Sequence, residues 1–274
     1  MGSSFTSSVS GTCFTKTMIF ILFLSQSSLF LSQHGAADEH AEDLVGALAY
    51  LKQLGVADEA LHVVLLAVAV AAEDLLALEA DLRAVDAGEE LGLRGLEGVG
   101  AAAYFSVLDD MILQGKETFF FRERSRRPPL DAFNALLSFA YSLLAHDCAA
   151  ALESVGLDAY VGYLHRDRPG RESLALDLME ELRPCFADRF VLTLINNRVL
   201  KVIDFDFRES GAVLLTDTGR RTFLQKWQER KKETITHPFL EEKIPWGLVP
   251  YVQSLLLARY LRGDLDDYPP FLWK

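Results

Sequence analysis

Hydrophobic side chains recur with helical spacing over most of this chain. The strongest such segment runs from about Ala132 to Ser154, and its first three turns are almost wholly apolar. A helix that is apolar on all sides is usually buried, so we expect this one at the centre of the fold. Asp131 precedes it and Gly156 follows it, and these residue types favour the start and the end of a helix respectively.

Four further helices are predicted around this central one. Ser173 is placed to cap the second of them, and Pro184 should end or kink it. A loop is expected just before Asp131, because Pro128 and Pro129 forbid helix continuation there. The four helices are expected in the region from 93 to about 115, from 174 to about 182, from about 221 to 233 and from about 241 to 262.

Strand-like patterns are rare. The convincing runs are Val199–Phe205 and Ala212–Leu215, which Gly211 separates, so they predict a small β-hairpin. The predicted fold is therefore mostly α, with a possible small hairpin.

The first third of the chain differs in composition from the rest. Residues 35–92 are rich in Ala, Leu, Val, Asp and Glu, which favours helix. Before them, Lys16 and the apolar run over 17–24 have the pattern of a secretory signal, but the run is too short to span a membrane. A non-secretory apolar leader, or a mis-set start codon, is the alternative. We expect a leader (1–34), an atypical helical segment (35–92) and a helical domain (93–274).

Charged residues are unevenly distributed along the chain, and this bears on whether it could bind nucleic acid. The chain has 274 residues, 50% of them hydrophobic, and a formal net charge of −12, as in a globular protein. The first 100 residues carry 4 basic and 14 acidic side chains, whereas residues 101–274 carry 23 and 25. Nucleic-acid binding would therefore depend on local basic patches. Three cysteines without paired spacing indicate a reducing compartment, and we expect a cytoplasmic protein.

The most informative cluster combines one histidine with three carboxylates. His165 precedes a predicted helix in which Asp177, Glu180 and Glu181 are three and four residues apart, so we expect all three carboxylates on one face. Like charges so placed repel one another unless solvent, a basic residue or a metal ion compensates them. A hard divalent cation would accept carboxylate oxygens and one imidazole. The alternative is a solvated acidic face beside an unrelated loop histidine.

Other residues bear on the same chemistry. Glu97, between Gly95 and Gly98, could reach a shared cavity, although it could equally be an ordinary glutamate at a helix start. No P-loop, dinucleotide-binding, zinc or serine-hydrolase motif is present in the sequence. Two basic clusters suit phosphate contacts, although either could be a solvated charged face: Arg122, Arg124, Arg126 and Arg127, and Arg220, Arg221, Lys226, Arg230, Lys231 and Lys232.

Several segments of residues 93–274 resemble one family. The chain is similar there to the catalytic domain of the CRISPR-associated endonuclease/integrase of spacer acquisition, the Cas-one family, in its type I-C branch. The segments that carry the resemblance are 126–139, 156–158, 161–165, 168–171, 173–181, 183–184, 194–198, 237–243 and 268–273.

The resemblance implies a metal-dependent DNA endonuclease/integrase of antiviral defence. Such an enzyme works with a small partner subunit, acts on double-stranded and branched DNA, and joins captured fragments to the CRISPR repeat by transesterification. Its metal ligands would fall on Glu97, His165, Asp177 and Glu180, with Mg²⁺ or Mn²⁺ as the cofactor, and no membrane is involved. The residues expected to bind the DNA are taken from the two basic clusters: Arg122, Arg124, Arg126, Arg127, Arg221, Lys226, Arg230 and Lys231.

The N-terminal part departs from the family pattern. The family has a β-rich N-terminal domain used in homodimerisation, yet residues 1–92 contain no series of alternating strands. We therefore expect that domain to be absent or replaced, which puts the homodimer in question. Two hypotheses stay open: an active integrase, and a catalytically incompetent DNA-binding remnant or scaffold.

Overall fold

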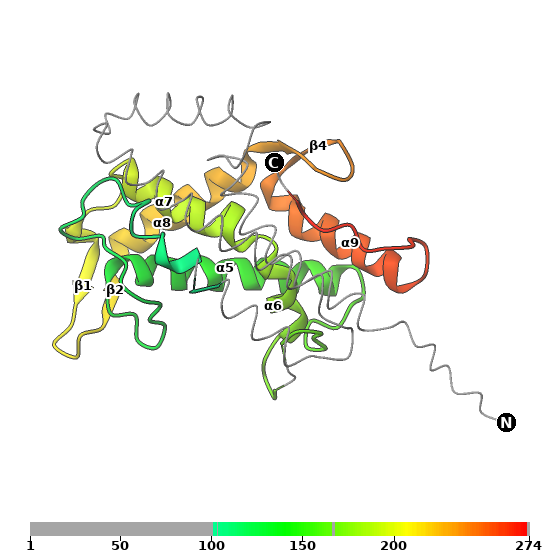
Figure 1. Ribbon diagram of the computed structural model, residues 1–274, viewed down its shortest axis with the longest axis horizontal. Helices are drawn as coiled ribbons and strands as arrows, with labels where there is room; N and C mark the ends of the chain where they lie inside the picture. The colour runs from blue at the N-terminus through cyan, green and yellow to red at the C-terminus, as the bar shows by residue number, and fades with distance from the viewer. Residues whose placement is uncertain (1–100, 103, 166–167, 273–274) are drawn as a thin grey trace.

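The computed structural model describes residues 101–102, 104–165 and 168–272 (Figure 1). The predicted leader over 1–34, the predicted helical segment over 35–92 and Glu97 all lie outside the described residues.

Helix α5 (Ala132–Ser154) is the central element, as predicted. The buried Asp131 carboxylate accepts a hydrogen bond of 2.6 Å from the backbone N–H of Asn134, which caps the first turn. At the other end, Gly156 has a φ of +82°, a conformation that glycine adopts without steric cost. α5 packs against α6, α7, α9 and β2, so most later elements are arranged around it (Figure 1).

The chain after α5 forms a helical path that changes its hydrogen-bond register. Helix α6 (Ser173–Glu180) leads into a π-helical turn (Arg183–Asp188) and then into α7 (Arg189–Asn196). Pro184 has no backbone N–H to donate, so it interrupts the α-helical ladder without stopping the helical path. The predicted cap at Ser173 is wrong, because Ser173 is the first helical residue and Glu172 precedes it without a side-chain cap.

Two short antiparallel hairpins follow. In the first, β1 (Phe205–Phe207) pairs with β2 (Val213–Leu215), and Gly211 turns the chain with a φ of +80°. This confirms the predicted hairpin, although residues 202–204 form a 3₁₀ turn and not strand. The second hairpin, β3 (Thr234–Thr236) with β4 (Lys243–Pro245), was not predicted.

The two C-terminal helices differ from the expected ones at their starts. α8 (Asp217–Lys232) begins early because the Thr216 hydroxyl accepts a hydrogen bond of 3.1 Å from the Gly219 N–H. α9 (Val249–Leu261) begins late because β4 and a 3₁₀ turn (Trp246–Leu248) occupy the residues before it. The helix expected to end near residue 115 also ends early, since turns replace it from residue 107 onward.

An aromatic cluster joins α7, α8 and the π-helical turn. Phe190 packs against Phe223 and Trp227 with ring centroids 5.2 Å apart, and Phe186 packs against Trp227 and Trp246. Within the described residues, one helix, α5, is long and apolar enough to cross a membrane by length and composition, and half of that apolar window is buried in this core. Its position is that of a core helix. Cys148 and Cys185 are buried free thiols, and burial raises the pKa of both.

Candidate active site

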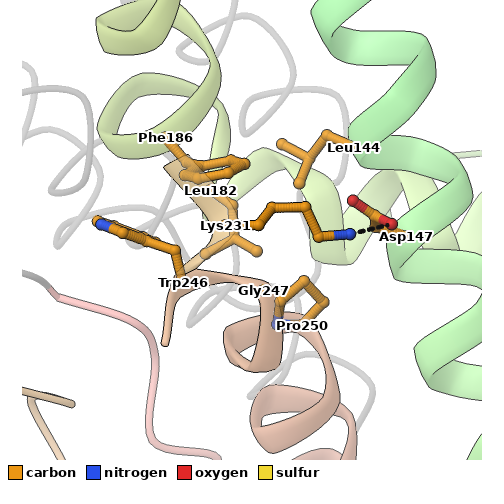
Figure 2. Close-up of a pocket in the computed structure, with 8 residues that line it drawn as sticks. All are labelled: Leu144, Asp147, Leu182, Phe186, Lys231, Trp246, Gly247 and Pro250. Carbon is orange, nitrogen blue, oxygen red and sulfur yellow. Dashed lines mark hydrogen bonds and ion pairs between the residues drawn. The ribbon is translucent and has the colours of Figure 1, made fainter. Parts of the chain in front are cut away.

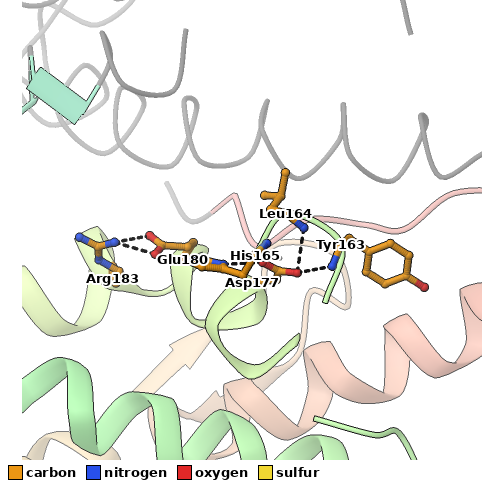
Figure 3. A network of polar contacts seen from close by, with 6 residues as sticks. All are labelled: Tyr163, Leu164, His165, Asp177, Glu180 and Arg183. Carbon is orange, nitrogen blue, oxygen red and sulfur yellow. Dashed lines mark hydrogen bonds and ion pairs between the residues drawn. The ribbon is translucent and has the colours of Figure 1, made fainter. Parts of the chain in front are cut away.

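Asp177 organises the loop that carries His165. Its side chain is fully buried on α6, and its carboxylate accepts hydrogen bonds from the backbone N–H groups of Tyr163 (2.6 Å), Leu164 (3.1 Å) and His165 (3.0 Å) (Figure 3). Three successive N–H groups therefore converge on one buried anion. This arrangement compensates the charge of Asp177 and fixes the loop against α6.

The same carboxylate orients the His165 ring. Nδ1 of His165 lies 2.6 Å from Oδ1 of Asp177, and 24% of the His165 side chain is exposed. A ring nitrogen facing a carboxylate carries the proton, so Nε2 is left to accept a proton or to ligate a metal ion. Histidines that ligate metals commonly donate their other ring N–H to a carboxylate in this way.

Glu180 lies one turn further along α6 and is also compensated. Nη1 of Arg183 donates to both of its oxygens, at 2.6 and 2.5 Å. The Arg183 guanidinium carbon lies 4.4 Å from the centroid of the Tyr141 ring. Behind it, the hydroxyls of Tyr141 and Tyr104 both donate to the buried carboxylate of Asp188.

Glu181 points elsewhere, so the predicted single face of three carboxylates is wrong. α6 ends at Glu180, and the fully buried Glu181 binds the C-terminal tail. It accepts hydrogen bonds from the Tyr268 hydroxyl (2.7 Å), Gln253 Nε2 (2.8 Å) and the Phe271 N–H (3.1 Å). Burial raises its pKa to about 7, against the lowering effect of these hydrogen bonds.

The donors around His165 fit a divalent cation in part. Nε2 of His165 and the Glu180 carboxylate are one nitrogen and two oxygen donors, a set that Mg²⁺ or Mn²⁺ accepts. Both carboxylates already accept hydrogen bonds, but those of Asp177 come from the loop and ring of His165 itself, whereas those of Glu180 come from one side chain, Arg183. We therefore take Asp177 as the group that orients His165. Among the described residues no group of three or more His, Cys, Asp and Glu side chains forms a metal site. The fourth predicted ligand, Glu97, lies outside them.

Four of the predicted DNA-binding residues already have partners in the protein. Nη1 of Arg124 donates to Asn134 Oδ1 (2.6 Å) and its Nη2 to the Ser138 hydroxyl (3.1 Å), so Arg124 ties the loop to α5. The three others form ion pairs: Lys226 with Glu229, Arg230 with Glu233, and Lys231 with Asp147 in the small pocket that Figure 2 shows.

The other four predicted DNA-binding residues are exposed to solvent. Arg126 and Arg127 lie in the loop before α5, and Arg122 lies in the same loop with its guanidinium over the Phe120 ring. Arg221 is exposed on α8. The loop therefore offers its arginines to a ligand more readily than the end of α8 does.

The residues behind Glu180 were not predicted from the sequence. Tyr104, Tyr141, Arg183 and Asp188 form one polar group that is buried at Tyr104 and Asp188, and they come from three parts of the chain. One signal was available, since Arg183 follows Glu180 by three residues, a spacing at which opposite charges meet on a helix.

Comparison with known proteins identifies the family. The family described as CRISPR associated protein Cas1 matches residues 48–229. CRISPR-associated endonuclease Cas1 2 of Rhodospirillum rubrum is 63% identical over 182 residues, which are 66% of this chain and 53% of the relative. CRISPR-associated endonuclease Cas1 1 of Chlorobaculum tepidum is 52% identical over 70% of this chain and 56% of its own length. The chain thus spans about half the length of these two curated relatives.

Solved structures share the fold at low sequence identity. A CAS1 protein from Thermotoga maritima is 22% identical with a TM-score of 0.68, over 92% of this chain and 66% of that one. A casposase bound to integration product is 21% identical with a TM-score of 0.69, over 96% of this chain and 67% of that one. The mostly helical fold is confirmed, as is the family resemblance. The chain belongs to the Cas1 family of CRISPR-associated proteins.

Proposed function

We propose that this chain is a metal-dependent DNA endonuclease and integrase of CRISPR adaptation. It would insert captured DNA fragments as spacers into the CRISPR array. The observation that carries the proposal is the site at α6, where the buried Asp177 orients the loop residue His165 and itself lies one turn before Glu180. Family membership adds support, since the curated relatives are named endonucleases.

The proposed reaction is a transesterification. A 3′ hydroxyl of the captured fragment attacks a phosphorus of the CRISPR repeat and displaces the 3′ oxygen on the other side of that phosphate. The attacking hydroxyl loses its proton and the displaced 3′ oxygen takes one up, so one hydroxyl replaces another. One phosphorus–oxygen bond forms and one breaks, so no oxidant or energy source is needed. We assign His165 Nε2 and the Glu180 carboxylate, together with Glu97, as the ligands of Mg²⁺ or Mn²⁺. The ion would supply charge stabilisation at the scissile phosphate.

Within this reaction the chain's own groups have separate tasks. Asp177 keeps the proton on Nδ1 of His165 and so keeps Nε2 available toward the substrate side. The hydrogen bonds from residues 163–165 to Asp177 fix the loop, so the ring does not have to be ordered when DNA arrives. The site is therefore preorganised on α6.

DNA and a small partner subunit are the proposed partners. Two of the structures that share the fold are Cas6-RT-Cas1–Cas2 complexes, and the casposase was solved with an integration product. On this chain, the exposed Arg126 and Arg127 are the arginines we assign to phosphate contacts. Arg124 would instead hold their loop in place.

Replacing both Arg126 and Arg127 with alanine should weaken DNA binding across sequences. Each lost phosphate contact removes about 0.9 from the slope of log affinity against log salt on duplex DNA, so the slope should fall by about 2. Binding isotherms at several salt concentrations measure this. Arg124→Ala is the matched control from the same loop: it should lower thermal stability and leave the salt slope nearly unchanged. An unchanged slope in the double variant would show that both arginines are structural.

The proposed function is tested directly by strand transfer. Branched CRISPR-repeat DNA is incubated with the full chain and Mg²⁺ or Mn²⁺, with and without the partner subunit. Wild type should cleave and transfer strands, and Glu97→Ala and His165→Ala should each lose the metal-dependent product while His165→Ala keeps nearly the wild-type melting temperature. Wild type that folds and binds DNA without forming product would favour the remnant hypothesis.

A further inference from the structure

The carboxylate of Glu180 is neutralised by one side chain. Only 6% of Glu180 is exposed, so water does little to solvate its charge. Nη1 of Arg183 donates to both carboxylate oxygens, at 2.6 and 2.5 Å (Figure 3). The guanidinium therefore occupies the position of a counter-ion to Glu180, at the carboxylate that we assign as a metal ligand.

Arg183 does not depend on Glu180 for its place. Its guanidinium lies 4.4 Å from the Tyr141 ring centroid, which attracts a cation. Tyr141 is in turn hydrogen-bonded to Asp188, which is 1% exposed. The Tyr141 ring is thus a second contact that can hold the Arg183 guanidinium when Glu180 turns to another cation.

The hydrogen bonding of Arg183 is incomplete. Its Nε is buried and has no hydrogen-bond partner in the part of the chain that the structure describes. Buried arginines with a purely structural role normally satisfy their donors, because an unmade buried hydrogen bond costs free energy. The described contacts of Arg183 therefore place its positive charge beside Glu180 and leave one of its donor groups without a hydrogen bond.

We infer that Arg183 is the resident counter-cation of Glu180 and competes with the divalent metal ion for that carboxylate. The inference rests on the proposed function, because it concerns the same metal site. Arg183 is then a positioning residue: it holds the metal-free site together and lowers the affinity for the ion by its positive charge. Removing the charge should make the metal bind more tightly and make the metal-free protein less stable.

The test is Mn²⁺ binding by the full chain, followed by calorimetry. Arg183→Gln keeps a hydrogen-bond donor near Glu180 and removes the charge, so its Mn²⁺ affinity should rise at least about tenfold, since a unit charge at this range interacts by several kcal/mol at protein surfaces. Arg183→Lys keeps the charge and should stay within about threefold of wild type. The melting temperature of Arg183→Gln should be lower than that of wild type without Mn²⁺ and equal to it at saturating Mn²⁺.

The outcomes separate the inference from the proposed function. If Glu180→Gln binds Mn²⁺ as wild type does, the metal site itself is wrong and the inference falls with it. If wild type binds through Glu180 but Arg183→Gln binds no more tightly, or stays equally destabilised with Mn²⁺, only the inference is overturned. Should Arg183→Gln fail to fold, Asp188→Asn replaces it. Without the negative charge of Asp188, Arg183 interacts more strongly with Glu180, so Mn²⁺ binding should weaken about threefold. Unchanged Mn²⁺ binding in Asp188→Asn would overturn the inference.

Discussion

Replacing Asp177 with asparagine should disable the candidate active site while the helical domain stays folded. The asparagine side chain can accept hydrogen bonds only at its oxygen. Its NH₂ group would face backbone N–H groups of residues 163–165 that donate to a carboxylate oxygen in the wild type. Loss of charge-assisted hydrogen bonds to a buried group costs about 2–4 kcal/mol. Removing the partner that orients a metal-ligating histidine typically lowers metal affinity or activity by about 10- to 100-fold.

The measurements for Asp177→Asn are strand transfer, Mn²⁺ affinity and amide hydrogen exchange at residues 163–165. Exchange there should speed up, while exchange in the core of α5 should keep its wild-type pattern. Asp158→Asn is the matched control, because the exposed Asp158 accepts a single backbone hydrogen bond, from Tyr160 N–H at 2.9 Å, in the preceding loop. It should change activity less than about twofold. Wild-type activity in Asp177→Asn would show that other contacts position His165.

Elements with strong local signals were predictable from the sequence. α5 has almost wholly apolar first turns, an aspartate cap before it and a glycine after it, and these signals agree with one another. The β3–β4 hairpin has no comparable signal, because its strands are three residues long and β3 buries one residue only, Ile235. α7 was missed because Pro184 predicts a break, whereas tertiary packing carries the chain through a π-helical turn.

The candidate site likewise has features that local sequence predicts and features that only the folded structure determines. Spacing and residue type were enough to draw attention to His165, Asp177, Glu180 and Glu181, because these are local properties, and the family resemblance then selected Glu180 over Glu181. The partners of each carboxylate depend on the fold: residues 163–165 lie at least 12 residues before Asp177, and Tyr268 lies 87 residues after Glu181. No sequence spacing predicts which of two adjacent glutamates faces the site and which faces the C-terminal tail.

Glu181 should make the stability of this protein fall as the pH rises toward neutrality. Its carboxyl is fully buried under the C-terminal tail, and burial raises its pKa from 4.5 to about 7. A carboxyl whose pKa is higher in the folded state binds its proton more tightly there than in the unfolded chain. The stabilisation is therefore fully present below about pH 4.5 and is lost as the pH rises to about 7. The whole loss is roughly 3 kcal/mol, since each pKa unit corresponds to about 1.4 kcal/mol.

The free energy of unfolding, measured by denaturant titration between pH 5 and 7.5, tests this prediction for Glu181. Other buried acids contribute to the same curve, because burial also raises the pKa of Asp188, so the quantity to compare is the slope of wild type minus that of Glu181→Gln. The difference should approach about −1.4 kcal/mol per pH unit between pH 5 and 6.5 and vanish above pH 7.5. Glu153→Gln, at an exposed position of α5, is the control and should keep the wild-type slope. Parallel curves for wild type and Glu181→Gln would mean that Glu181 stays ionised beneath the tail, with the three donors that face it outweighing its burial.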